Sequence, residues 1–173
     1  MSKKITGVCL IIMLCLLVGC QKKPAGTKNP SPSPSSVTNP TGSVPFQAVE
    51  VPIYTISADL SELVATGVLI DVEKELTVDL VVSAVSEALQ DNAIDTKMNQ
   101  VILGSHFVTL DFDPSAPPVT GVSAELEELI LDAYAQSVLD NFSDFSEVRI
   151  TMNGYAYASA HKKLGLNEAY LRR

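Results

Sequence analysis

Two carboxylates one residue apart, Asp111 and Asp113, come nearest to metal chemistry among the 173 residues of this sequence. Carboxylates at this spacing can share a calcium or magnesium ion. Their neighbourhood, HFVTLDFD, alternates as a strand, which places both side chains on one face with Thr109, pointing to water. The further oxygen ligands and the glycine-rich turn of a calcium loop are missing. We therefore expect solvated carboxylates, no metal site and no cofactor.

Other residues that could do chemistry are few. His106 and His161 are the only histidines, and neither has the spacing of a zinc ligand. The stretch Leu103-Gly-Ser-His106 lacks the second glycine of a serine-hydrolase elbow. All three cysteines lie within the first 20 residues, so the rest of the chain offers no thiol nucleophile, thiolate zinc site or disulfide. We predict no catalytic residues and a protein that is not an enzyme.

Two further clusters favour structural roles. Glu125, Glu127 and Glu128 follow a serine that can cap a helix, where the helix dipole favours acids in the first turn. Tyr155 and Tyr157 alternate with alanine, so we expect them on one face of a strand. Core or cross-strand packing is favoured for these tyrosines over a platform for a partner or a glycan.

A different chemistry is expected at Cys20. Two lysines precede an apolar run over residues 8–18, which as a helix would span only about 16 Å of the ~30 Å bilayer core. The run ends in Leu17-Val18-Gly19-Cys20, which resembles a bacterial lipobox. The resemblance implies cleavage after Gly19 and a diacylglyceryl group on the Cys20 thiol. The alternative is an ordinary signal peptide that ends near a chance cysteine.

The organisation that follows has three parts. Residues 1–19 are predicted to be a lipoprotein signal peptide, and 20–45 to be the lipidated, palmitate-bearing cysteine with a disordered Pro/Ser-rich tether, since the tether has too few apolar residues to fold. Residues 46–173 are predicted to be a single domain. The lysines of the tether can attract anionic head groups or simply keep a spacer soluble, and the sequence leaves both open.

Charge is divided along the chain. The total is 12 Lys and Arg against 20 Asp and Glu, a net charge of −8. All the acids lie from residue 50 onward, so residues 46–173 carry 20 acidic and 7 basic side chains, a net charge of −13. Such a surface repels nucleic acid, and we expect no nucleic-acid partner.

Hydrophobic periodicity predicts an α+β fold, with two amphipathic helices packed on one face of a small, mainly antiparallel sheet. The helices are expected from Thr77 to about Asp91 and from Ser123 to about Asn141. A short helix is expected within 162–173. Asn153-Gly154 is a hairpin signal. Strands are expected at 51–56, 68–72, 101–103, 107–112, 147–152 and 155–160.

The order of HFVTLDFD, an acidic helix and FSEVRITMNG resembles the GerMN domain of bacterial sporulation and germination lipoproteins. The strand Val51–Ile56 opens that domain in the same way, and the resemblance covers roughly residues 50–160. It implies a non-enzymatic module, similar to ring-building domains of secretion machines, that positions envelope proteins during spore formation.

These features together predict a lipid-anchored binding or assembly module on the extracytoplasmic face of the cell membrane, with a role in sporulation or spore germination. We expect the membrane to be contacted through Cys20 and the domain to bind an unidentified envelope protein through its surface or a sheet edge. The alternatives are a cell-wall-acting enzyme with a cleft near Asp111 and Asp113, and a small ligand-binding lipoprotein.

Overall fold

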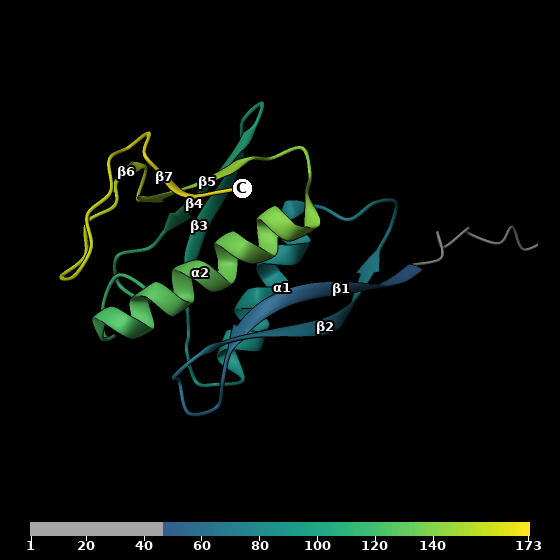
Figure 1. Cartoon of the computed structure of the whole chain (residues 1–173), viewed down its shortest axis with the longest axis horizontal. Coiled ribbons are helices and arrows are strands. Elements are labelled where there is room, and N and C mark those ends of the chain that lie inside the picture. The colour runs from purple at the N-terminus through teal and green to yellow at the C-terminus, as the bar shows by residue number, and fades with distance from the viewer. Residues whose placement is uncertain (1–46) are drawn as a thin grey trace, which may run out of the picture. The chain divides into compact units, whose positions relative to one another are not determined.

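Two helices and seven strands follow one another in the computed structural model, which describes residues 47–173 (Figure 1). The predicted signal peptide, Cys20 and tether lie outside the described residues. Within those residues, neither helix is long and apolar enough to cross a bilayer. The elements are β1 (Gln47–Ile56), β2 (Leu63–Val72), α1 (Val78–Gln90), β3 (Met98–Leu103), β4 (Phe107–Phe112), α2 (Ala124–Asn141), β5 (Glu147–Met152), β6 (Tyr155–Ala156) and β7 (Ala169–Arg172).

The strands form two sheets. β1 and β2 pair antiparallel over their whole length, from Gln47 opposite Val72 to Ile56 opposite Leu63. The second sheet runs β3–β4–β5, and both β6 and β7 pair with β5. β4 and β5 are parallel because α2 provides the crossover between them, and the other pairs are antiparallel. The predicted α+β class with a mainly antiparallel sheet is confirmed.

The helices contact both sheets. α1 and α2 pack against each other, both contact β1, and α2 also contacts β5 and β7 (Figure 1). The Tyr134 hydroxyl of α2 is hydrogen-bonded to Ser86 of α1 and to Thr96, while its ring meets Phe112 of β4 edge-on at 5.4 Å. The fully buried core draws on both sheets and both helices, and its largest members are Tyr134, Tyr157, Phe112, Ile53, Ile56, Leu89, Leu110, Ile130, Leu131 and Ile150.

Local signals place the element ends as predicted. Thr77 Oγ1 accepts a hydrogen bond from the Leu80 N–H at 3.3 Å, and Ser123 Oγ accepts one from the Leu126 N–H at 3.2 Å. Each is an N-cap that satisfies a backbone donor of the first helical turn. Asn153 and Gly154 have φ of 50° and 76°, the left-handed conformations that a two-residue hairpin turn requires.

The C-terminal region differs from the prediction. The expected strand over 155–160 is paired only at Tyr155–Ala156, with one isolated bridge between Ala158 and Lys163. The expected helix over 162–173 is wrong, because residues 169–172 form β7 on the first half of β5. β6 occupies only the second half of that edge of β5, so the other half is free to pair with the returning chain.

The two edges of the β1–β2 hairpin differ. On the outer edge of β1, the Tyr54 N–H donates to Ser137 Oγ of α2 at 2.8 Å. On the same strand, Asn141 Nδ2 of α2 donates to the Pro52 carbonyl at 2.7 Å. The outer edge of β2 has no strand partner among residues 47–173. The hairpin therefore has one edge covered by a helix and one that is open.

Candidate functional site

The structure does not bring Asp111 and Asp113 together as a metal or acid pair. Asp111 is 1 % exposed, and its Oδ1 accepts from Thr151 Oγ1 and from the Gly154 N–H, both at 2.7 Å. Asn99 Nδ2 donates to its Oδ2 at 3.2 Å. The expectation that Asp111 points to water is wrong, because β4 is an inner strand and Asp111 lies opposite Thr151 of β5.

Thr109 is also buried, for the same reason. Asp113 follows β4 and turns to its own loop, where its Oδ1 accepts from the Ser115 N–H at 2.7 Å. Hydrogen bonds from Ser115 hold the pKa of Asp113 below its usual range. The two carboxylates thus serve different parts of the fold.

The three glutamates at the start of α2 also lie in different environments. Glu125 and Glu128 are exposed, but Glu127 is 1 % exposed. Its Oε1 accepts from the Tyr157 hydroxyl at 2.9 Å and from Ser159 Oγ at 2.7 Å. The expectation that Glu127 only satisfies the helix dipole is wrong, since it also ties α2 to the segment after β6.

The two tyrosines of that segment do not share an environment. Tyr157 is fully buried, whereas Tyr155 is 74 % exposed. β6 ends at Ala156, so the alternation of a strand does not continue to Tyr157. Burial and the nearby Glu127 carboxylate raise the pKa of Tyr157 above its usual range. Core packing is confirmed for Tyr157. Tyr155 is not in the core, but it lies opposite Met152 of β5, as the cross-strand alternative requires.

The two histidines lie in different loops, His106 between β3 and β4 and His161 between β6 and β7. His106 is exposed, and its Nδ1 is hydrogen-bonded to the Ser105 hydroxyl. His161 Nε2 lies 3.2 Å from the Val122 carbonyl oxygen. Over residues 47–173, no three His, Cys, Asp or Glu side chains gather in a way that could hold a metal ion.

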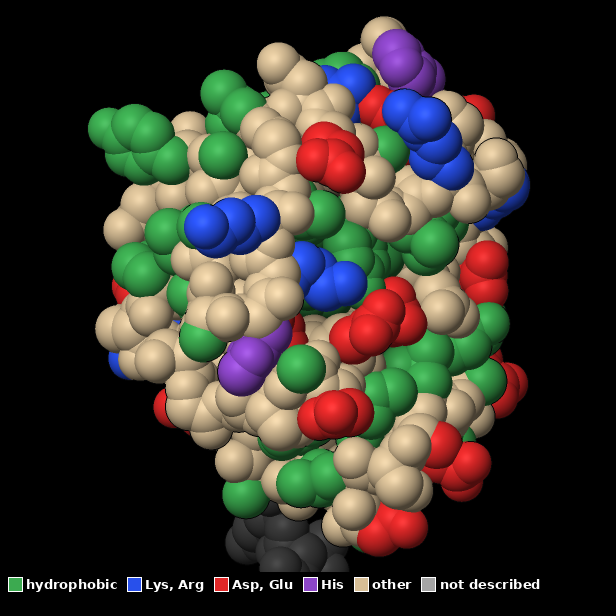
Figure 2. All heavy atoms as spheres, turned by 60° about the vertical axis from the view of Figure 1, so that its left-hand side comes forward, with side chains coloured by type: hydrophobic (Ala, Val, Ile, Leu, Met, Phe, Trp, Pro, Cys, Tyr) green, Lys and Arg blue, Asp and Glu red, His purple; other side chains and the backbone are tan. Residues whose placement is uncertain are grey.

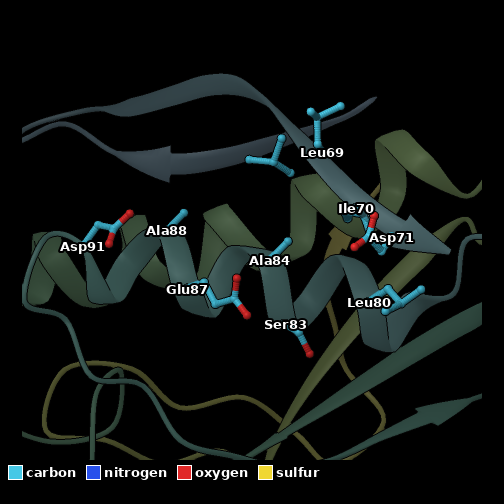
Figure 3. Close-up of a pocket in the computed structure, with 10 residues that line it drawn as sticks. Leu69, Ile70, Asp71, Leu80, Ser83, Ala84, Glu87, Ala88 and Asp91 are labelled. Atoms are coloured by element: carbon cyan, nitrogen blue, oxygen red, sulfur yellow. The ribbon is translucent and has the colours of Figure 1, made fainter. Parts of the chain in front are cut away.

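The open edge of β2 borders a groove of about 330 Å³ between that strand and α1 (Figure 3). Ala84 and Ala88 of α1 point toward the hairpin, and their small side chains leave the gap between strand and helix. Leu69 points away from α1 and is 75 % exposed. The residues that line the groove are Val68, Leu69, Ile70, Asp71, Leu80, Ser83, Ala84, Glu87, Ala88 and Asp91.

Three exposed carboxylates, Asp71, Glu87 and Asp91, stand among these ten residues, and no Lys or Arg does. The groove therefore combines apolar side chains, negative charge and a row of backbone groups that pair with no other strand of the described part of the chain. A protein edge of this kind can accept an additional strand.

A second groove, of about 400 Å³, lies on the other side of α1 against β3, which is an edge strand of the larger sheet. Ser83 and Glu87 border both grooves, and Figure 3 shows the Ser83 side chain pointing away from the hairpin. The second groove is more polar, because Ser86, Asn99 and Gln100 also line it. The exposed side of α1 thus lies between two strand edges.

Charge is unevenly distributed over the described residues. Residues 47–96 contain ten acids and a single base, Lys74. Five of the other six bases are Arg149, Lys162, Lys163, Arg172 and Arg173, which lie on β5, on β7 or beside β7. Lys and Arg side chains gather in the upper half of the face shown in Figure 2.

Glu147 is the acid that these bases engage most closely. Arg149 Nε donates to Glu147 Oε1 at 2.8 Å, and Arg172 Nε lies 3.3 Å from Oε2. The hydrogen bond from Arg149 and the charges of both arginines hold the pKa of Glu147 below its usual range. The guanidinium of Arg149 also lies 3.7 Å from the centre of the Phe107 ring. Arg149 and Arg172 are therefore paired within the fold, whereas the carboxylates of the β2–α1 groove form no ion pair within residues 47–173.

Comparisons with known proteins find similarity among solved structures. No family model matches the sequence, and no curated protein matches it. Among solved structures, the tandem GerMN domains of the sporulation protein GerM from Bacillus subtilis are similar to this chain, with a TM-score of 0.49 and 21 % identity. The match covers 80 % of this chain and 49 % of that one, so it spans about half the length of the tandem structure.

Sequence reasoning missed the groove. The prediction placed a strand only at 68–72, whereas β2 begins at Leu63. The alternation of Val64, Thr66 and Val68 was a usable signal for the longer strand. No signal in the sequence tells that the outer edge of this strand lacks a neighbour.

Proposed function

We propose that this protein is a lipid-anchored binding or assembly module of the bacterial envelope, which binds a protein partner through the open edge of β2. The observation that carries the proposal is the ten-residue edge of β2, which has no partner strand within residues 47–173 and lies beside the groove of α1. A groove that runs along a strand suits an extended polypeptide, because backbone hydrogen bonds supply affinity and alternate side chains supply specificity.

The anchor is proposed from the sequence. Cys20 at the end of the lipobox-like motif would carry a diacylglyceryl group. Its two acyl chains would anchor the protein stably, whereas a single chain gives only marginal membrane binding. The Pro/Ser-rich residues that follow would hold the domain away from the extracytoplasmic surface of the membrane. A role in sporulation or germination is proposed from the resemblance of HFVTLDFD and FSEVRITMNG to the GerMN pattern.

A role in binding is also supported by the buried carboxylates. A catalytic carboxyl group has to reach a substrate. Asp111 and Glu127 are instead buried and occupied by hydroxyl and backbone donors. We therefore propose that the protein is not an enzyme.

The anchor is tested by Cys20→Ala. Lipidation predicts that this variant leaves the membrane fraction or accumulates as uncut precursor. Unchanged membrane attachment with a band of mature size would refute it. A strain that lacks the protein is expected to sporulate poorly or to mislocalise an envelope protein, and normal spores with normal localisation count against the sporulation role.

The binding edge is tested by a photo-crosslinking amino acid placed at Leu69 in cells. The matched control is the same amino acid at Tyr155, whose side chain is equally exposed, at 74 % against 75 %, but lies on β6. We expect a discrete adduct with an envelope protein from position 69 only. Equal adducts from both positions, or none from position 69 during growth and sporulation, would contradict binding through β2.

A further inference from the structure

We propose that the occupant of the β2–α1 groove is a basic, extended polypeptide segment, which adds to β2 as a third strand. This inference rests on the proposed binding function and specifies the chemistry of the partner.

Backbone geometry supports a strand as occupant. At about 3.3 Å per residue, the ten residues of β2 offer roughly 33 Å of edge. An added strand would lie about 4.8 Å from β2, on the side where Val68, Ile70 and Asp71 border the groove. Helix α1 faces that space with Ala84 and Ala88, whose small side chains leave room for another backbone.

Alternation then divides the side chains of the occupant. Every second side chain of an added strand would point toward Leu80, Ala84 and Ala88 of α1, a site that suits small or β-branched apolar residues. The intervening side chains would lie on the face of the hairpin that carries Leu69. The occupant is therefore expected to alternate apolar residues with polar or charged ones.

Charge selects a basic segment. Asp71, Glu87 and Asp91 border the groove and form no ion pair within residues 47–173, in a half of the domain with ten acids and one base, Lys74. An anionic lipid surface or a nucleic acid would be repelled by these carboxylates. A second copy that paired through its own β2 would bring the same three carboxylates and would be repelled as well. Lysine or arginine on the occupant would lie along β2, which carries Asp71, and Glu87 and Asp91 on the α1 side add to the negative potential of the groove.

The test uses the full-length protein, purified in a mild detergent, and a fluorescent probe peptide, Lys-Val-Thr-Val-Lys-Val-Thr-Val-Lys. Anisotropy is measured at low and at high salt. Two control peptides isolate the two requirements: one has Glu in place of each Lys, and one carries N-methyl groups on alternate residues, which remove backbone donors. We expect binding of the Lys peptide that weakens with salt, and at least tenfold weaker binding of both controls.

A matched pair of variants tests the groove itself. Asp71→Asn/Asp91→Asn removes two groove carboxylates, and Asp95→Asn/Asp144→Asn removes two exposed carboxylates elsewhere. Exposed ion pairs are individually weak, so the groove variant should bind the Lys peptide about fivefold more weakly than the parent. The control variant should bind it as the parent does. Hydrogen exchange should show new protection of β2 amides when the peptide is bound.

Several results would overturn the proposal. These are equal binding of the Glu or the N-methylated peptide, no difference between the two Asp pairs, or protection outside residues 63–72. The chain's own Lys22, Lys23 and Lys28 provide a competing basic segment. If changing them to Gln raises the affinity for the probe severalfold, the occupant is this segment and not a partner.

The two proposals fail in different ways. If position 69 crosslinks to an envelope protein but the Lys peptide does not bind, the binding function is retained and the proposal of a basic occupant is rejected. If the Lys peptide binds specifically but no adduct forms in cells, the preference of the groove for a basic strand is supported and the proposal of an envelope partner is rejected.

Discussion

Asp111→Asn is expected to destabilise the domain strongly, although it exchanges two side chains of nearly equal shape. The carboxylate is buried and accepts three hydrogen bonds, from Thr151, Gly154 and Asn99. An amide in its place keeps one acceptor oxygen, which can still accept the hydrogen bonds from Thr151 Oγ1 and the Gly154 N–H. Its nitrogen would face the Nδ2 of Asn99, so that two donors meet.

The magnitude follows from these three contacts. A hydrogen bond to a charged group contributes about 1.5–3 kcal/mol and one to a neutral group about 0.5–1.5 kcal/mol, so each of the two retained bonds weakens by about 1 kcal/mol. Loss of the hydrogen bond from Asn99, where two donors now face each other, costs about 1 kcal/mol more. The expected fall in the free energy of unfolding is about 3 kcal/mol, or about 150-fold in the folding equilibrium constant. For a domain of this size, it lowers Tm by roughly 10 °C.

The assay is urea unfolding followed by far-UV circular dichroism, since the chain has no Trp to report by fluorescence. Asp113→Asn is the matched control: its carboxylate accepts a single N–H, from Ser115, near the surface, and we expect a loss below 1 kcal/mol. The m value, which is the slope of the unfolding free energy against urea concentration, should be unchanged in both variants. Equal effects at 111 and 113, or a loss below 1 kcal/mol at 111, would refute the reasoning.

Three further predictions test other parts of the fold. Tyr157→Phe leaves Glu127 with Ser159 as its only side-chain donor and should lower the free energy of unfolding by about 2 kcal/mol, whereas Tyr155→Phe should leave it unchanged within about 0.5 kcal/mol. The folded-state pKa of Glu147 is depressed, so its pairing stabilises the fold at neutral pH and is lost as pH falls below the ordinary glutamate pKa of about 4.3. Urea midpoints of Glu147→Gln should therefore fall less steeply between pH 5 and pH 3 than those of the parent, and parallel curves would contradict the pairing. Ser123→Ala should cost about 1 kcal/mol through loss of the cap of α2, and an unchanged urea midpoint would argue against that cap.

The features that sequence predicted correctly are encoded locally. The starts of both helices follow from Thr77 and Ser123, each of which caps a backbone N–H three residues ahead. The hairpin after β5 follows from Asn153-Gly154, two residues suited to positive φ. Apolar periodicity then sets which helix faces are buried.

The features that sequence missed depend on distant partners. Asp111 meets Thr151 and Gly154, about 40 positions later, only because β4 and β5 pair in parallel around α2. Glu127 is buried by Tyr157, 30 positions away. Strand β7 forms because half of one edge of β5 is unoccupied. The open edge of β2 is likewise a property of the assembled fold, since local propensity says nothing of a neighbour.

The unequal edges of the β1–β2 hairpin bear on aggregation. Cross-β growth needs a strand that can template new chains on both sides, so that each added copy exposes the next edge. On β1, Ser137 and Asn141 occupy backbone groups that such growth would use, and Pro52 has no N–H to offer. Copies of this hairpin can therefore pair through β2 only once, because the far edge of each copy is its covered β1. The domain can keep an edge open for recruitment without that edge seeding a fibre.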